Sequence, residues 1–139
     1  MKAIERPMIR AVVMLALAAA AATGYALPQP KTENGITYVS GGIGADEAKA
    51  MLAEAMRYPL SAVFFANRNN EYLADVEVTI TDNAGREVLS AISEGPIMLL
   101  EIPAGRYTVE AEVGGKTLRR TVQVWEDSPQ QIGFHWPRF

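Results

Sequence analysis

The chain has 139 residues with 13 basic and 16 acidic side chains, a net charge of −3, one histidine and no cysteine. This mildly acidic balance excludes the electrostatic footprint of a nucleic-acid binder or of a protein that binds an anionic membrane. A single histidine cannot supply the two imidazoles of a zinc hydrolase motif, and without cysteine there is neither a disulfide nor a thiolate metal site. We therefore expect no catalytic residues, no metal and no cofactor.

The first 26 residues are expected to be an export signal. Lys2, Arg6 and Arg10 give a positive start, an unbroken apolar run covers residues 11–22, and the segment ends in small residues at Ala26. A helix over that run would rise only about 18 Å, which is short of the roughly 30 Å hydrocarbon core of a membrane. We expect cleavage after Ala26, which leaves a periplasmic or secreted chain without a membrane anchor.

A linker, a short strand and a helix are expected next. Residues 27–35 contain two prolines and an Asn-Gly pair, which predicts an exposed linker, and residues 36–59 then hold a short strand, a glycine-rich turn and a helix. The G-G-I-G of the turn lacks the spacing of a phosphate-binding loop. In the helix, expected over residues 46–57, one apolar stripe follows the helical period and should be buried against a sheet: Ala48, Met51, Leu52, Ala55 and Met56.

Residues 60–139 are expected to form a β-sandwich domain. From Leu60 onward the apolar period changes to two, and turn signals recur every eight to twelve residues. Strands are predicted at residues 60–66, 72–81, 86–93, 97–102, 106–113 and 117–124, followed by a last strand near the C-terminus. The fold class is therefore mainly β, a seven-stranded Greek-key-like sandwich with one N-terminal amphipathic helix.

The last predicted strand bears most on function. Ile132, Phe134 and Trp136 alternate with small or polar residues, so they are expected to enter the core and Trp136 to be buried. His135 falls on the opposite face of that strand, where a solvated or cross-strand histidine is expected rather than a catalytic base. Glu110 and Glu112 share one strand face, as exposed faces of acidic sheets commonly do.

Two motifs carry a resemblance to a known family. V-x-V-x-I-x-D-x-x-G runs from Val76 to Gly85, and I-P-A-G-R-Y-T-V runs from Ile102 to Val109. This pair resembles the carboxypeptidase regulatory-like domain, a prealbumin-like sandwich grouped with carbohydrate-binding-like folds. The whole layout also resembles small proteobacterial periplasmic proteins that bear this domain. The resemblance implies a sandwich with an Asp/Gly hairpin and a corner at which Tyr107 packs into the core, and it implies no chemistry.

Two classes of function remain open. The first is a non-catalytic interaction module that binds an envelope protein or a peptide, and the second is a module that binds a glycan on exposed aromatic rings. The aromatic candidates are Tyr58, Tyr72, Trp125 and Trp136. Because Tyr107 and Trp136 are expected in the core, Tyr72 and Trp125 are the better exposed pair and the candidate ligand-binding residues. Two coplanar exposed rings close to each other would favour the glycan.

Overall fold

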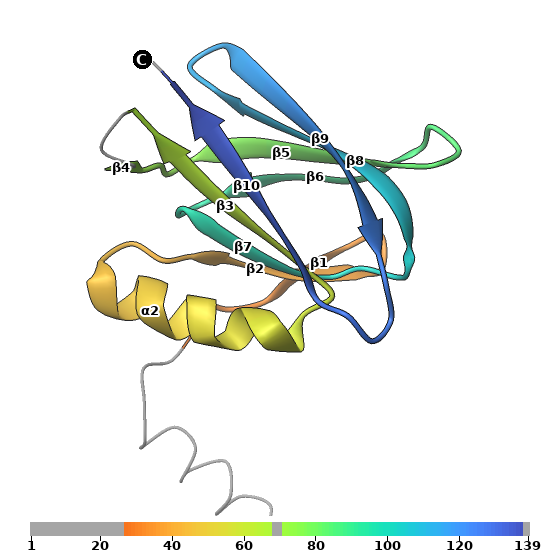
Figure 1. Cartoon of the computed structure of the whole chain (residues 1–139), viewed down its shortest axis with the longest axis horizontal. Helices are drawn as coiled ribbons and strands as arrows, with labels where there is room; N and C mark the ends of the chain where they lie inside the picture. The colour runs from red at the N-terminus through yellow and green to blue at the C-terminus, as the bar shows by residue number, and fades with distance from the viewer. Residues whose placement is uncertain (1–26, 68–70, 138–139) are drawn as a thin grey trace, which may run out of the picture.

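The computed structural model describes residues 27–67 and 71–137, and it consists of two β-sheets and one helical layer (Figure 1). The expected export signal lies outside the described residues. The elements are β1 (Lys31–Glu33), β2 (Ile36–Gly41), α2 (Ala45–Glu54), η1 (Ala55–Arg57), β3 (Leu60–Ala66), β4 (Glu71–Tyr72), β5 (Val76–Asp82), β6 (Glu87–Ser93), β7 (Ile97–Glu101), β8 (Gly105–Val113), β9 (Lys116–Val124) and β10 (Gln130–Trp136).

The strands form a six-stranded and a four-stranded sheet. The six-stranded sheet has the order β1-β2-β7-β3-β10, with β4 paired to β3, and the four-stranded sheet has the order β6-β5-β8-β9. All neighbours are antiparallel except β3 and β10, which pair in parallel from Leu60 opposite Gln130 to Ala66 opposite Trp136. The mainly β prediction is confirmed, but the described residues form ten strands rather than seven.

The inner faces of the two sheets make the main core. Val76, Val78 and Ile80 of β5 are buried there, as the two-residue alternation predicts. Phe134 and Trp136 of β10 lie opposite them, with ring centroids 6.2 Å apart. Trp136 is only 1% exposed, and its Nε1 donates a hydrogen bond to the Lys116 carbonyl at 3.0 Å. The predictions that Trp136 is buried and that its strand pairs within a sheet are confirmed.

A second apolar cluster lies on the outer face of the six-stranded sheet. There α2 covers β2 and β7, and Met51 is fully buried together with Ala48 and Ala55. The expectation that the whole stripe is buried is wrong, because Leu52 is 37% exposed and Met56 is 72% exposed. Only one side of the helix meets the sheet. The tighter η1 turn, which has three residues per turn, also changes the direction of the Met56 side chain relative to a continuous α-helix.

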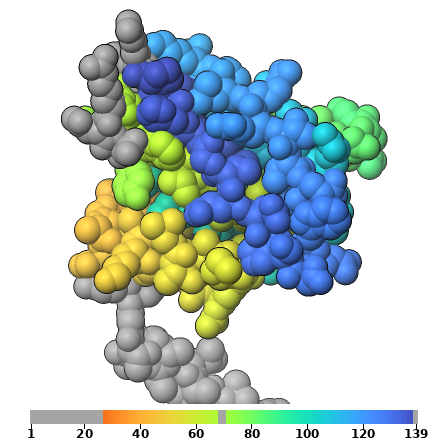
Figure 2. Space-filling view, in the orientation of Figure 1, coloured from red at the N-terminus to blue at the C-terminus, as the bar shows by residue number. Residues whose placement is uncertain are grey.

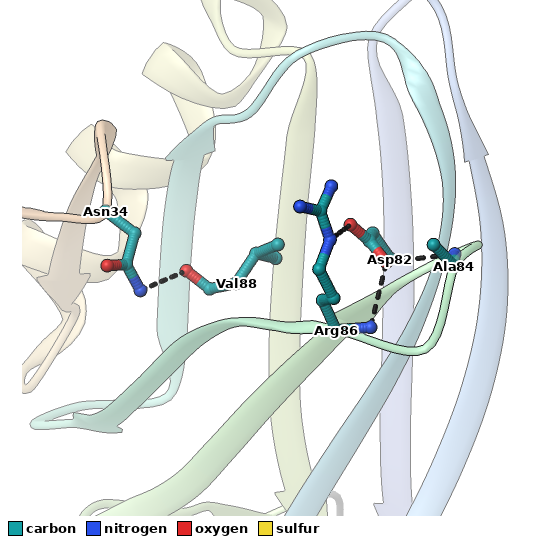
Figure 3. A network of polar contacts seen from close by, with 5 residues as sticks. All are labelled: Asn34, Asp82, Ala84, Arg86 and Val88. Carbon is teal, nitrogen blue, oxygen red and sulfur yellow. Dashed lines mark hydrogen bonds and ion pairs between the residues drawn. The ribbon is translucent and has the colours of Figure 1, made fainter.

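The expected linker is partly a strand. Lys31–Glu33 pairs with β2 through a two-residue turn in which Asn34 and Gly35 both have positive φ, the geometry that an Asn-Gly hairpin favours. This hairpin covers the free edge of β6. The Ser90 N–H donates to Glu33 at 2.7 Å, and Asn34 donates to the Val88 carbonyl at 3.1 Å (Figure 3). Residues 31–41 therefore belong to the sandwich and are not a separate preceding segment.

Two turns of the four-stranded sheet have the predicted roles. In the hairpin between β5 and β6, Asp82 Oδ1 accepts the backbone N–H groups of Ala84 and Arg86, each at 2.9 Å (Figure 3). These bonds, the one from Arg86 above all, lower the pKa of the Asp82 carboxyl. At the corner before β8, Tyr107 is buried and its hydroxyl donates to the Pro103 carbonyl at 2.8 Å.

The predicted strand over residues 72–81 is interrupted. Tyr72 belongs to the short β4, and Asp75, with a φ of 56°, separates it from β5. An L-residue seldom adopts this left-handed conformation inside a strand, so the chain changes direction there. The alternation of β5 itself begins at Val76, which is where the core-facing pattern starts.

The glycine-rich turn between β2 and α2 is built for close packing. A Cβ on Gly95 would clash with the Gly41 carbonyl, so the two backbones can lie this close only with glycine at position 95. The Gly42 N–H donates to Glu47 Oε1 at 2.7 Å. A carboxylate of the protein itself therefore occupies a donor that a phosphate-binding turn would offer to its ligand.

Candidate functional site

The two aromatic residues predicted as ligand-binding candidates are both exposed but do not lie together. Tyr72 is 53% exposed and pairs with Phe65 near the end of β3, whereas Trp125 is 52% exposed and follows β9. Trp125 lines a hollow with Pro59, which directly precedes β3. β3 begins directly after Pro59, which lies in the hollow with Trp125, and reaches Phe65, which pairs with Tyr72. This length of strand spans roughly 17 Å at about 3.3 Å per residue. The two rings therefore form no common platform.

The hollow around Trp125 is an open depression of about 500 Å³. Three segments line it: η1 with the turn that follows it, the β7–β8 loop at Pro103, and the β9–β10 loop. Figure 2 shows the yellow η1 region and the blue segment near the β9–β10 loop side by side on the lower part of the visible face. The Gln130 N–H donates to the Pro59 carbonyl at 3.0 Å, which fixes the β9–β10 loop against the turn before β3.

The Trp125 hollow exposes large apolar side chains. Trp125 and Met56 are two of the six large hydrophobic side chains that the described residues leave exposed, and both contribute to it. Tyr58 is half-buried beside them. Three prolines in the same lining stiffen the loops that form it: Pro59, Pro103 and Pro129. The flat indole of Trp125 and the flexible thioether of Met56, held by these stiff loops, make a surface suited to binding apolar or aromatic groups.

Negative charge accompanies these apolar groups. Glu101, Glu126 and Asp127 line the Trp125 hollow, and the one basic residue of the lining, Arg57, lies 3.7 Å from Glu54. Partial burial raises the pKa of the Tyr58 hydroxyl, and the carboxylates of Glu101 and Glu54 raise it further. The carboxylates of Glu101 and Glu54 therefore act on the hydroxyl of Tyr58, one of the lining residues.

A larger, open hollow of about 850 Å³ includes the outer face of the four-stranded sheet. Its lining is mainly polar, and neighbouring strands supply partners to two of its carboxylates. Arg119 bonds Glu110 at 2.9 Å, and Thr117 donates to Glu112 at 3.0 Å. Within residues 27–67 and 71–137, no group of three or more histidine and acidic side chains is placed to hold a metal ion. Among the described residues, this hollow contains one exposed large apolar side chain, Ile92, whereas the Trp125 hollow contains two.

His135 takes the cross-strand position expected for it. Its ring stacks on Phe65 of the neighbouring strand at 5.2 Å, and its Nε2 lies 2.8 Å from the Asn67 carbonyl oxygen. Gly133 lies beside the Phe65 ring on the same face, where an added Cβ would be in ordinary van der Waals contact with the ring. The ring of His135 thus joins two strands on an exposed face.

Sequence reasoning identified Trp125 but missed its neighbours in the hollow. The apolar stripe placed Met56 in the core, and Tyr58 was one of the aromatic candidates but not one of the two preferred. Pro59 directly follows Tyr58, and Pro129 lies shortly after Trp125. These prolines were the available sequence signal that both segments form stiff exposed loops. Nothing local in the sequence shows that these loops meet.

The described residues define a β-sandwich with one helix-covered sheet and an open aromatic hollow. No known family model matches the chain, and no curated protein matches it. None of the helices in residues 27–67 and 71–137 is both long and apolar enough to cross a membrane.

Proposed function

We propose that the protein is a non-catalytic periplasmic interaction module that binds a protein or peptide partner in the Trp125 hollow. One observation carries the proposal: Trp125 and Met56, from distant parts of the sequence, are exposed in the same hollow. The other tryptophan and the helix methionine Met51 are buried. Large exposed apolar side chains that converge in a depression are typical of binding surfaces.

The physical properties of the hollow support a peptide as ligand. Tryptophan and tyrosine supply broad contact area at low entropic cost, and methionine adapts its shape to varied side chains. The prolines keep the lining loops from losing much freedom on binding, which favours affinity. A glycan is the alternative, supported by the exposed Trp125 indole with Tyr58 beside it, but Tyr72 lies too far away to extend that surface.

The compartment and family belong to the same proposal. The signal-like residues 1–26 support export to the periplasm. The Asp82 hairpin and the Tyr107 corner support membership of the carboxypeptidase regulatory-like group. The chain passes from β6 to the other sheet and returns as β8 beside β5, which supports the Greek-key-like description.

The test compares two exposed aromatics at opposite ends of the sandwich. Wild type, Trp125→Ala and Tyr72→Ala are each probed with a random octapeptide library and with an array of defined oligosaccharides, after circular dichroism has shown equal folding. We expect peptides that bind wild type and Tyr72→Ala but lose binding to Trp125→Ala. Oligosaccharide binding alone would support the alternative. A Trp125→Ala protein that binds as wild type does would overturn the proposal.

A further inference from the structure

The Trp125 hollow has a chemical bias beyond its apolar character. Its lining contains three carboxylates against one guanidinium, and that guanidinium already lies beside Glu54. Among the described residues, Glu126 and Asp127 make no ion pair or hydrogen bond, and both are exposed next to Trp125 in the chain. A ligand that brings a positive charge would therefore meet carboxylates that no cation in residues 27–67 and 71–137 neutralises.

We infer that the Trp125 hollow recognises its peptide through an arginine side chain. This inference rests on the proposed function and names the chemistry of the partner. The guanidinium would stack on the Trp125 indole while Glu126 and Asp127 balance its charge, and the apolar neighbours of the arginine would contact Met56 and Pro59. Arginine suits this arrangement better than lysine because its planar, weakly hydrated group both stacks on indole and bonds carboxylates.

The same lining disfavours other occupants. An acidic peptide would bring like charges close to Glu101, Glu126 and Asp127, which costs binding energy. A neutral apolar peptide would leave the carboxylates without a counter-charge. Burial is the largest cause of the raised pKa of the Tyr58 hydroxyl, and the carboxylates of Glu101 and Glu54 add to it, so Tyr58 also lies near negative charge.

The larger hollow provides a control for charge alone. Asp75 and Glu77 line it, also carry negative charge and lie away from Trp125. Asp75→Asn is a mild change because asparagine tolerates the positive φ of that position. The double variant Asp75→Asn/Glu77→Gln therefore removes two charges from the surface, as Glu126→Gln/Asp127→Asn does, but leaves the Trp125 hollow intact.

The experiment uses three pools of acetylated, amidated octapeptides whose central residue is arginine, citrulline or glutamate and whose flanks are the same random mixture of apolar and proline residues. Citrulline keeps the planar shape of arginine without its charge. Calorimetric or anisotropy titration is carried out on wild type, Trp125→Ala and the two double variants. We expect the arginine pool to bind wild type about 5- to 30-fold more tightly than the citrulline pool.

The variants separate this inference from the proposed function. Glu126→Gln/Asp127→Asn should remove most of the preference for arginine and leave citrulline binding unchanged, while Asp75→Asn/Glu77→Gln should keep the preference. Equal binding of arginine and citrulline pools that Trp125→Ala abolishes would overturn the inference and leave the proposed function standing. Equal weakening by both double variants would show a general charge effect and also overturn the inference. Binding that survives Trp125→Ala would overturn both.

Discussion

Replacing Trp136 by alanine should be the most informative test of the sandwich. The indole is buried between the two sheets, stacks on Phe134, lies tilted against Phe64, and donates a hydrogen bond to the Lys116 carbonyl of β9. Removing a buried aromatic of this size costs about 3–5 kcal/mol of unfolding free energy, because the transfer energy is lost and a cavity remains. At roughly 4 °C per kcal/mol for a domain of this size, the melting temperature should fall by about 12–20 °C.

Thermal and urea unfolding, followed by circular dichroism, measure this loss. Trp125→Ala is the matched control, since the same residue type is removed from an exposed position and stability should change by no more than about 0.5 kcal/mol. A chain ending at Gln130 should fail to fold, because a total stability of about 5–15 kcal/mol cannot absorb the loss of β10. Unchanged melting of Trp136→Ala or of the truncated chain would refute the assignment of β10 as a core strand.

Three further predictions follow from particular residues. Met51→Ala should cost about 2–5 kcal/mol and Met56→Ala no more than about 0.5 kcal/mol in urea unfolding, and equal losses would contradict the placement of the helix. Asp82→Asn should lower the melting temperature at neutral pH. Because the folded-state pKa of Asp82 is depressed, its ionised form stabilises the fold above the ordinary carboxyl pKa of 3.8, and the gap to wild type should close as the pH falls below that value and through the depressed pKa; a gap independent of pH would refute this. Mass spectrometry of the exported protein should find Leu27 as the first residue, and an intact Met1 in the membrane fraction would contradict the export signal.

The strands and their inward faces could be predicted because burial imposes a period of two on the sequence. Val76, Val78 and Ile80 alternate with polar residues, and Phe134 and Trp136 repeat that pattern at the other end of the domain. A one-residue shift in strand register would turn these apolar side chains toward solvent. The alternation therefore specifies which face is buried wherever the other face is exposed to solvent. The Asn-Gly pair at Asn34 was also a hairpin signal, but the polar strand before it showed no apolar alternation.

Which residues of the helix contact the sheet could not be predicted from the periodicity of the sequence. The apolar stripe of residues 48–56 is wider than the strip that β2 and β7 cover, so Leu52 and Met56 lie outside the contact. Which member of a stripe is covered depends on the tilt of the helix on its sheet, a tertiary property. The Trp125 hollow is also tertiary, because it exists only where three loops distant in sequence meet.

The two tryptophans and two of the methionines allow the residues needed for folding to be distinguished from those proposed for binding. Trp136 and Met51 are buried and belong to two apolar clusters, whereas Trp125 and Met56 are exposed and belong to one hollow. Single exposed apolar residues are common on protein surfaces. That does not explain why Trp125 and Met56 are exposed in the same hollow, beside carboxylates without a described cationic partner. If the hollow were only a by-product of loop packing, alanine at Trp125 would alter neither stability nor binding. If Trp125→Ala loses binding while its melting temperature is unchanged, the exposed pair serves a ligand. A lowered melting temperature of Trp136→Ala assigns Trp136 to the fold.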